Sequence, residues 1–274
     1  MILKNTVALV TGSARGIGRV IAQTLVEQGS KVALVDILED ELEETSAEFR
    51  TRGGHVLPVK TDITDLNQVK AMGERIETEL GPVDILINNA GTFSVVDTVW
   101  ECDPERWFRD IKVNLYGSFL VSHVVVKGMV ERKRGYVINM VSSGGVLDPH
   151  PYSTSYASSK TGLMRLTEGL AKEVEEYGIK VFAVAPPAIF TEMTRFILND
   201  PGGKKWRPNF GNIFEEKKDY PPEIVSDLIL KLLSGRADKL SGRYFLPHRD
   251  NFEKMVEQAD DIIAHDLWTL RIRE

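Results

Sequence analysis

The sequence contains a single cysteine and no concentration of positive charge. Cys102 cannot form an internal disulfide, and no set of Cys and His residues has the spacing of zinc ligands. The chain therefore fits a reducing compartment, and we expect a cytoplasmic protein with no metal site. The 34 basic residues are scattered and are outnumbered by 40 acidic ones, giving a net charge of −6. This balance disfavours binding to nucleic acid.

Long hydrophobic runs are also absent. The first residues, Met1 to Asn5, lack the long apolar stretch of a signal peptide. The longest later apolar run, Val181 to Phe190, is too short to span a membrane. We expect no membrane partner. The sequence shows no repeat, low-complexity stretch or interdomain linker, and 274 residues with 42% hydrophobic and 27% charged content are typical of one globular domain.

Short runs rich in β-branched and apolar residues alternate with longer amphipathic stretches. The stretches carry apolar residues at helical spacing, as at Val69, Met72 and Ile76. This alternation predicts an α/β fold, a doubly wound and mostly parallel sheet with helices on both faces of a single domain. The predicted strands are Thr6–Val10, Lys31–Asp36, Val56–Lys60, Val83–Ile87, Tyr136–Val141, Lys180–Ala185 and Arg243–Leu246.

Two segments interrupt this regular alternation. Residues 186–222 are rich in Pro, Gly, Asn and aromatic residues, and we predict a substrate loop or lid over 190–222. The C-terminal tail, 249–274, is predicted to be helical and to pack on the domain or on a neighbouring subunit. Its apolar face comprises Phe252, Met255, Val256, Ala259, Ile262 and Ile263.

Glycines follow the first predicted strand directly, in the segment Thr11-Gly12-Ser13-Ala14-Arg15-Gly16-Ile17-Gly18. An amphipathic helix comes next, so these glycines lie at a turn from strand to helix. Glycine permits the tight turn and lets the backbone approach a pyrophosphate at the helix N-terminus. The segment therefore predicts a dinucleotide-binding site.

Asp36, at the end of the second predicted strand, bears on which dinucleotide binds. A carboxylate there accepts hydrogen bonds from both ribose hydroxyls of NAD but repels the 2′-phosphate of NADP. At about 4 Å and an effective dielectric constant near 20, that repulsion is on the order of 4 kcal/mol. We predict NAD rather than NADP, although the guanidinium of Arg15 could pair with a 2′-phosphate.

Tyr156 and Lys160 lie one turn apart on one face of a predicted helix. A phenol has an ordinary pKa near 10, and a neighbouring ammonium together with an oxidised nicotinamide would favour the phenolate. Lowering that pKa by three units requires about 4 kcal/mol. The segment Ser142-Ser143-Gly144-Gly145 adds hydroxyls at the carboxyl end of a predicted strand, where open α/β sheets bind ligands.

With these motifs the chain resembles the short-chain dehydrogenase/reductase family in its shorter single-domain form, from about Thr6 to Leu246. The glycine segment, Asn88-Asn89-Ala90-Gly91, Asn114, Ser143 and the pair Tyr156 and Lys160 follow the family's order. The resemblance implies a Rossmann-type dinucleotide-binding and catalytic domain over residues 1–248. It also implies a homodimer or homotetramer assembled through the helices that contain Asn114 and Tyr156.

The resemblance assigns the expected site residues. The catalytic set is Asn114, Ser143, Tyr156 and Lys160, with Tyr156 as acid/base and Ser143 on the substrate oxygen. Lys160 would lower the tyrosine pKa and bind the nicotinamide ribose, and Asn114 would hold a water of a proton relay. The cofactor set is Gly12, Arg15, Gly16, Ile17, Gly18, Asp36, Asp62, Ile63, Asn89, Ala90, Gly91, Tyr156, Lys160, Pro186, Ile189 and Thr191. Substrate contacts are expected from Ser143, Phe93, His150, Tyr152 and the 190–220 loop.

Two departures from the family pattern affect these expectations. Pro186-Pro187 stands where the family usually has Pro-Gly, which removes a backbone donor and fixes the second φ near −65°. The chain continues after His248-Arg249 into the helical tail, where the family commonly ends soon after its last strand. Family rules for subunit contacts through the C-terminus therefore need not apply here.

The leading hypothesis is an NAD-dependent oxidoreductase that interconverts a secondary alcohol and a ketone by hydride transfer on a small-molecule substrate. One alternative is an NADPH-dependent 3-oxoacyl-carrier-protein-type ketoreductase, for which Lys204, Lys205 and Arg207 could attract an acidic carrier. Another is a non-catalytic dinucleotide-binding sensor. A third, an epimerase or dehydratase of the extended relatives, usually has a different glycine spacing and a longer chain.

Overall fold

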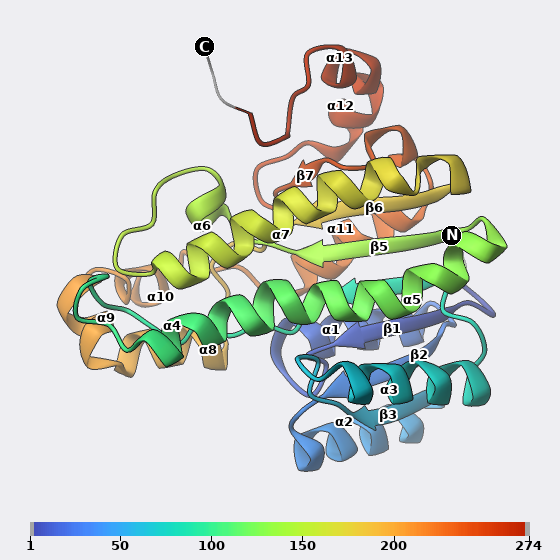
Figure 1. Cartoon of the computed structure of the whole chain (residues 1–274), viewed down its shortest axis with the longest axis horizontal. Coiled ribbons are helices and arrows are strands. Elements are labelled where there is room, and N and C mark those ends of the chain that lie inside the picture. Colours follow the sequence, from blue (N-terminus) through green and yellow to red (C-terminus); the bar gives the residue numbers. More distant parts are fainter. Residues whose placement is uncertain (1–2, 272–274) are drawn as a thin grey trace.

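The structure is a computed structural model that describes residues 3–271. Within them a parallel seven-stranded sheet has the order β3-β2-β1-β4-β5-β6-β7 (Figure 1). The strands are β1 Val7–Thr11, β2 Lys31–Asp36, β3 Val56–Lys60, β4 Ile85–Asn88, β5 Gly135–Met140, β6 Ile179–Val184 and β7 Tyr244–Phe245. The predicted doubly wound α/β fold is confirmed, and each predicted strand is present within two residues of its expected ends.

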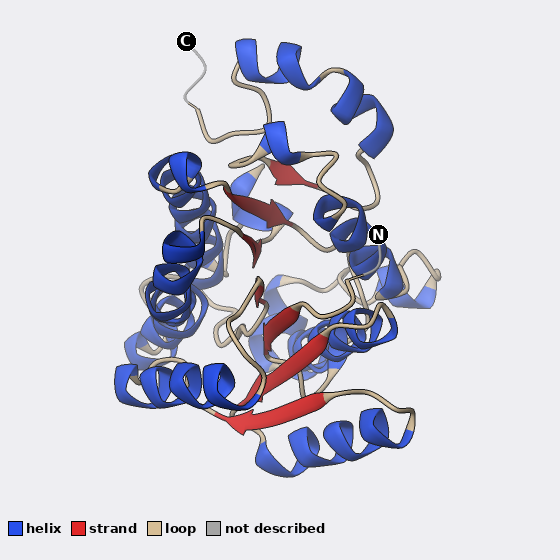
Figure 2. Ribbon diagram, turned by 90° about the vertical axis from the view of Figure 1, so that its right-hand side faces the viewer, coloured by secondary structure: helices blue, strands red, loops and turns tan. Residues whose placement is uncertain are grey.

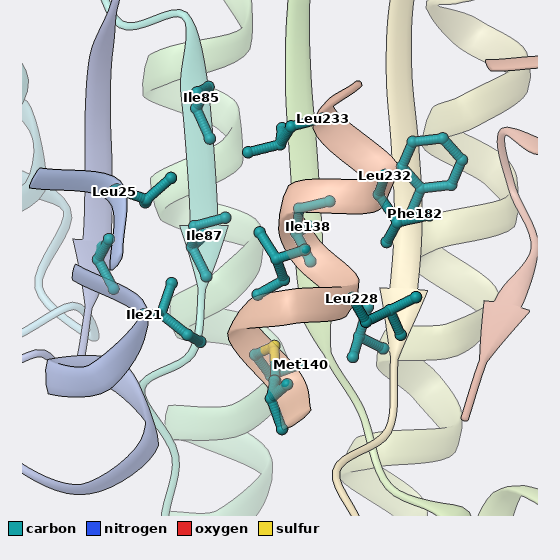
Figure 3. Close-up of a cluster of buried hydrophobic side chains, with 14 of the residues drawn as sticks. Ile21, Leu25, Ile85, Ile87, Ile138, Met140, Phe182, Leu228, Leu232 and Leu233 are labelled. Atoms are coloured by element: carbon teal, nitrogen blue, oxygen red, sulfur yellow. The ribbon is translucent and has the colours of Figure 1, made fainter. Parts of the chain in front are cut away.

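Alternate residues of each strand enter cores on opposite faces of the sheet, because successive side chains of a strand point in opposite directions. On one face, α1 (Gly16–Glu27), α2 (Glu39–Thr51) and α11 (Glu223–Leu233) cover Val10, Ile87 and their neighbours. Figure 3 shows this core, in which Leu228, Leu232 and Leu233 of α11 meet Ile138, Met140 and Phe182.

The opposite face is covered by α3 (Leu66–Glu79), α5 (Ser118–Arg132) and α7 (Thr154–Glu173). Figure 2 shows the strands nearly edge-on between these two helical layers. The short 3₁₀ turns Glu175–Tyr177 and Asp238–Leu240 complete connections between elements. Both faces of the sheet are therefore buried, which explains why the residues of its strands are predominantly apolar.

One long helical run crosses the second face. It comprises α4 (Pro104–Asp110), a π-helix (Ile111–Gly117) and α5. Asp103 begins it, accepting hydrogen bonds from the backbone N–H groups of Glu105 and Arg106. The run has the length and hydropathy of a membrane span, but half of its most apolar window is buried in this fold.

Residues 190–222, which we predicted to be a substrate loop or lid, contain three short helices. The helices are α8 (Glu192–Asn199), α9 (Pro201–Trp206) and α10 (Asn212–Glu215). Thr191 caps α8, and Asp200 caps α9 by accepting hydrogen bonds from Gly202 and Gly203. Short helices of this kind depend on caps and tertiary contacts, so hydrophobic periodicity does not reveal them.

The C-terminal tail folds back on the same chain. It forms α12 (Phe252–Glu257) and α13 (Ala259–Ala264), which lie beyond β7 in Figure 1. Met255 and Ile262 are buried in the core that contains α11, whereas Ile263 is exposed. Further along, the backbone N–H of Leu270 donates to Glu168 on α7. The tail thus belongs to the domain's own core at this edge of the sheet.

Replacing Ile262 with Ala should therefore lower the free energy of unfolding by roughly 2–4 kcal/mol, because it removes buried apolar contacts. Ile263→Ala is the matched control, since Ile263 is 42% exposed, and it should change stability by less than about 0.5 kcal/mol. Urea unfolding of both variants measures the difference. Equal effects would show that the tail does not pack as described.

Candidate active site

The carboxyl ends of the strands open into a cavity of about 820 Å³. Residues from the turn after β1, the ends of β2 and β5, the segment after β4, α7 and α8 line it. In Figure 1 the arrowhead of β5 points toward the end of the molecule that carries α8, α9 and α10. The cavity thus lies where doubly wound sheets bind ligands.

The floor of the cavity is the glycine turn between β1 and α1. Gly12 and Gly16 have φ angles of +66° and +60°, in the left-handed region that favours glycine. A Cβ on Gly12 would lie 2.7 Å from the Ala90 Cα, and one on Gly18 would lie 2.1 Å from the Gly12 carbonyl oxygen. The Arg15 side chain does not cap α1, so the first N–H groups of that helix remain available to an anion.

The acidic end of the cavity is formed by Asp36. Its carboxylate accepts hydrogen bonds from the backbone N–H groups of Ala14 at 3.0 Å, Ile37 at 2.8 Å and Leu38 at 3.1 Å. These bonds fix the carboxylate beside the glycine turn. Arg15 pairs with Glu41 of α2 at 3.2 Å on the surface.

The predicted cofactor residues come together along this cavity. All sixteen line it, from the glycine turn through the segments after β3 and β4 to α7 and the segment after β6. The backbone cradle at Gly12, Gly16 and Gly18, the helix N-terminus and the fixed carboxylate match the pyrophosphate and ribose of a dinucleotide. Pro186, Pro187 and Ala188 also line the cavity, so the double proline keeps that segment at the site.

Lys160 is buried on α7, one turn after Tyr156. Its ammonium donates a hydrogen bond to the Met140 carbonyl oxygen at 2.8 Å and lies 5.9 Å from the centroid of the Tyr156 ring. Burial lowers the pKa of Lys160 to about 8. The strand end of β5 and the helix α7 therefore hold the ammonium beside the tyrosine.

Tyr156 faces the cavity from the first turn of α7. Burial raises the pKa of its phenol, and the charge of Asp110 adds to that rise. A hydrogen bond from the Ser142 hydroxyl and the charge of Arg207 oppose it. Lys160 is not among the groups that lower this pKa, so the expected lowering of the tyrosine pKa by Lys160 is not found in the described residues.

Ser142 lies next to the predicted Ser143, on the same cavity that Tyr156 faces. Ser142 also caps the short helix α6 (Ser143–Val146), where its hydroxyl accepts from the Gly144 N–H at 3.2 Å. Ser143 lines the cavity as well. Two adjacent serines have the same chemistry, so the sequence alone could not show which hydroxyl reaches the phenol.

Asn114 is buried in the π-helix between α4 and α5. Its amide accepts from the Thr92 N–H at 2.7 Å and donates to the Thr92 carbonyl and the Ser159 hydroxyl, both at 2.9 Å. A Cβ on Gly91 would lie 3.1 Å from the Asn114 Oδ1 and 3.4 Å from the Lys160 Nζ. Gly91 therefore borders both polar groups. π-Bulges often occur at functional positions of this kind.

Asp110 is a site residue that our sequence reasoning missed. It is fully buried and accepts hydrogen bonds from the Thr92 hydroxyl, the Ser94 N–H and the Ser155 hydroxyl. It thereby ties α4 to the segment after β4 and to the start of α7. No local pattern distinguishes this aspartate from the exposed acids of amphipathic helices.

The predicted substrate contacts are only partly brought together. Phe93 and His150 line the cavity, but Tyr152 is absent from its lining and stacks on Trp206 with ring centroids 4.3 Å apart. Lys204, Lys205 and Arg207, which we considered as a basic patch, do not share one exposed surface. Lys204 and Lys205 are exposed, whereas Arg207 is half-buried and lines the cavity.

Residues 6–202 match the family model described as short chain dehydrogenase. The chain is 31% identical over 244 residues to 2,3-dihydro-2,3-dihydroxybenzoate dehydrogenase of Bacillus subtilis (strain 168), covering 87% of this chain and 93% of the relative.

Solved structures show the same similarity. A gluconate 5-dehydrogenase from Burkholderia cenocepacia J2315 in complex with NADP and tartrate has a TM-score of 0.78 at 28% identity, with 89% of this chain and 94% of that chain covered. A 7α-hydroxysteroid dehydrogenase complexed with NADH and 7-oxo glycochenodeoxycholic acid has a TM-score of 0.78 at 27% identity, with 89% and 93% covered.

Proposed function

This chain belongs to the short-chain dehydrogenases, a family of oxidoreductases that bind a nicotinamide dinucleotide, and we propose that it interconverts a secondary alcohol and a ketone with NAD as the preferred cofactor. One observation carries this proposal. Tyr156 stands beside Ser142 and Lys160 in the same cavity whose other end fits a dinucleotide. Similarity to proteins named for a dihydroxybenzoate, a gluconate and a hydroxysteroid supports alcohol chemistry and leaves the substrate open.

The residues of the chain handle the proton and the substrate oxygen. When bound, the dinucleotide supplies the hydride chemistry. Tyr156 gives a proton to the carbonyl oxygen in reduction and takes it from the hydroxyl in oxidation. Ser142 donates a hydrogen bond to the same oxygen and stabilises the negative charge that develops there. Lys160 and Asn114, both beside Gly91, connect the tyrosine to solvent as a proton relay through a water that Asn114 holds.

The preference for NAD rests on charge at the acidic end of the cavity. The Asp36 carboxylate is fixed beside the glycine turn by three backbone N–H groups. Arg15, which could otherwise accept a 2′-phosphate, pairs with Glu41. A 2′-phosphate there would face Asp36 and compete with Glu41 for Arg15, so both contacts favour the unmodified ribose.

The carrier-protein ketoreductase is the weaker alternative. Of the three basic residues considered for binding the carrier, Arg207 lines the cavity, so only Lys204 and Lys205 are exposed at the surface. Two lysines on a chain of net charge −6 offer little attraction to an acidic carrier. A small-molecule substrate fits the site better.

An exposed aromatic surface supports a homodimer or homotetramer. Phe108, Tyr116 and Phe119 are 55%, 44% and 42% exposed along the run from α4 to α5. The Tyr116 and Phe119 rings stack at 6.1 Å, and His123 continues the row. Apolar surface of this kind is typical of a subunit interface.

Tyr156→Phe tests the proposed function. Because it removes the hydroxyl that transfers the proton, it should lower kcat by about 100-fold or more while the affinity for NADH stays unchanged. The comparison uses turnover of an alcohol that the wild-type protein oxidises, together with NADH binding measured by fluorescence. Turnover near the wild-type level in this variant would contradict the proposal.

The two adjacent serines provide a matched pair of variants. Ser142→Ala should lower kcat by roughly 100-fold, because the hydroxyl that we assign to the reacting oxygen is lost, whereas Ser143→Ala should change kcat only a few-fold. Steady-state kinetics of both variants under saturating cofactor decides between them. The reverse order would assign the role to Ser143.

Phe119→Glu should weaken the subunit interface, because it places a charge in the exposed aromatic row. Sedimentation velocity should show a dimer or tetramer for the wild-type protein and a smaller species for the variant. Ile263→Glu, at an equally exposed apolar position on the tail, serves as the control and should keep the wild-type state. A monomeric wild-type protein would refute the assembly.

A further inference from the structure

Arg207 brings a positive charge to the substrate end of the cavity. It follows α9 directly, at the C-cap of that helix, and is half-buried. Its Nη2 lies 2.8 Å from the His150 Nδ1 and 3.0 Å from the His150 Nε2. Its Nε is buried and makes no hydrogen bond within residues 3–271. The guanidinium therefore retains unused donors inside a cavity.

The groups around Arg207 do not neutralise its charge. Burial and the charge of Arg207 lower the pKa of His150 to about 4, so this imidazole is neutral at pH 7 and serves as an acceptor. In the part of the chain that the structure describes, no carboxylate lies within 4.0 Å of the Arg207 guanidinium. A partly desolvated cation without a counter-ion is costly unless a ligand supplies the opposite charge.

Arg207 also lies close to the reacting group. Its guanidinium carbon is 5.7 Å from the centroid of the Phe93 ring, and the Phe93 and Tyr156 rings lie with centroids 4.6 Å apart and planes tilted by 37°. Its partner His150 rests on Gly144, where an added Cβ would lie 3.0 Å from the His150 Nε2. The Phe93 ring thus lies between the Arg207 guanidinium and the Tyr156 ring, and His150 links Arg207 to the segment 142–145.

We propose that the substrate is a hydroxy acid or keto acid whose carboxylate is bound by Arg207. This inference rests on the proposed function and names the substrate class of the same site. The planar guanidinium matches a carboxylate with two parallel hydrogen bonds, and His150 holds it in place from the other side. Phe93, Phe196 and Phe210 provide apolar walls for the remainder of the molecule.

The experiment measures preference for an anion without requiring turnover. Benzoate and benzamide have the same shape and differ in charge. Each is titrated by calorimetry into the protein with and without saturating NADH. Benzoate should bind to the wild-type protein at least about tenfold more tightly than benzamide, because only benzoate offers the Arg207 guanidinium a charged acceptor.

Three variants identify the origin of this preference. Arg207→Gln should make the two affinities equal, and Arg207→Lys should retain part of the preference because the positive charge remains. Lys204→Gln removes an exposed charge three residues away, on the same helix, and should behave like the wild-type protein. Thermal unfolding and NADH binding of the Arg207 variants confirm that they are folded.

Equal affinities for the two probes, undetectable binding of benzoate, or a preference that persists in Arg207→Gln would each overturn the proposal. The titration without NADH keeps this result separate from the proposed function. Failure of the dinucleotide proposal would appear as an absence of NADH binding, whereas failure of the carboxylate proposal would appear as an absence of acid preference.

Discussion

The turn after β1 and the segment after β4 approach one another so closely that a side chain at Gly12 would collide with the Ala90 backbone. The Asn89 side chain holds this contact by donating to the carbonyl oxygens of Thr11 and Gly12, both at 3.0 Å. The Thr11 hydroxyl accepts from the N–H groups of Asn89 and Ala90 in return. The first turn of α1 consequently presents its N–H groups to the cavity, and the rest of the site is arranged around this floor.

The cavity is electrically divided along its length. Asp36 stands at the end of β2, where Glu41 of α2 pairs with Arg15, whereas Lys160 and Arg207 stand at the end that contains Tyr156. The acidic end suits the hydroxyls of an adenosine ribose. The basic end favours oxygen that carries negative charge, both on the reacting atom and on a substrate carboxylate. The difference in charge between the two ends would therefore favour the dinucleotide ribose at one end and the substrate at the other.

The sequence was sufficient to predict the sheet because both faces of the strands are buried and their residues are predominantly apolar. It was also sufficient for the glycine turn, whose residue type is dictated by backbone geometry. It was insufficient where tertiary contacts decide. The helices α8 to α10 depend on caps at Thr191 and Asp200, and the choice between Ser142 and Ser143 depends on the local path of one strand end. Arg207 enters the cavity from the C-cap of α9, which only the tertiary fold places there.

The central claim is that this cavity holds a dinucleotide whose adenosine ribose lies against Asp36. Equilibrium binding of NADH and NADPH to the wild-type protein, read by energy transfer from its tryptophans to the reduced nicotinamide, tests it most directly. The account predicts that NADH binds at least about tenfold more tightly than NADPH, since only the latter places a phosphate beside the carboxylate. Equal or tighter binding of NADPH would contradict the account and would show that Arg15 leaves Glu41 for the 2′-phosphate.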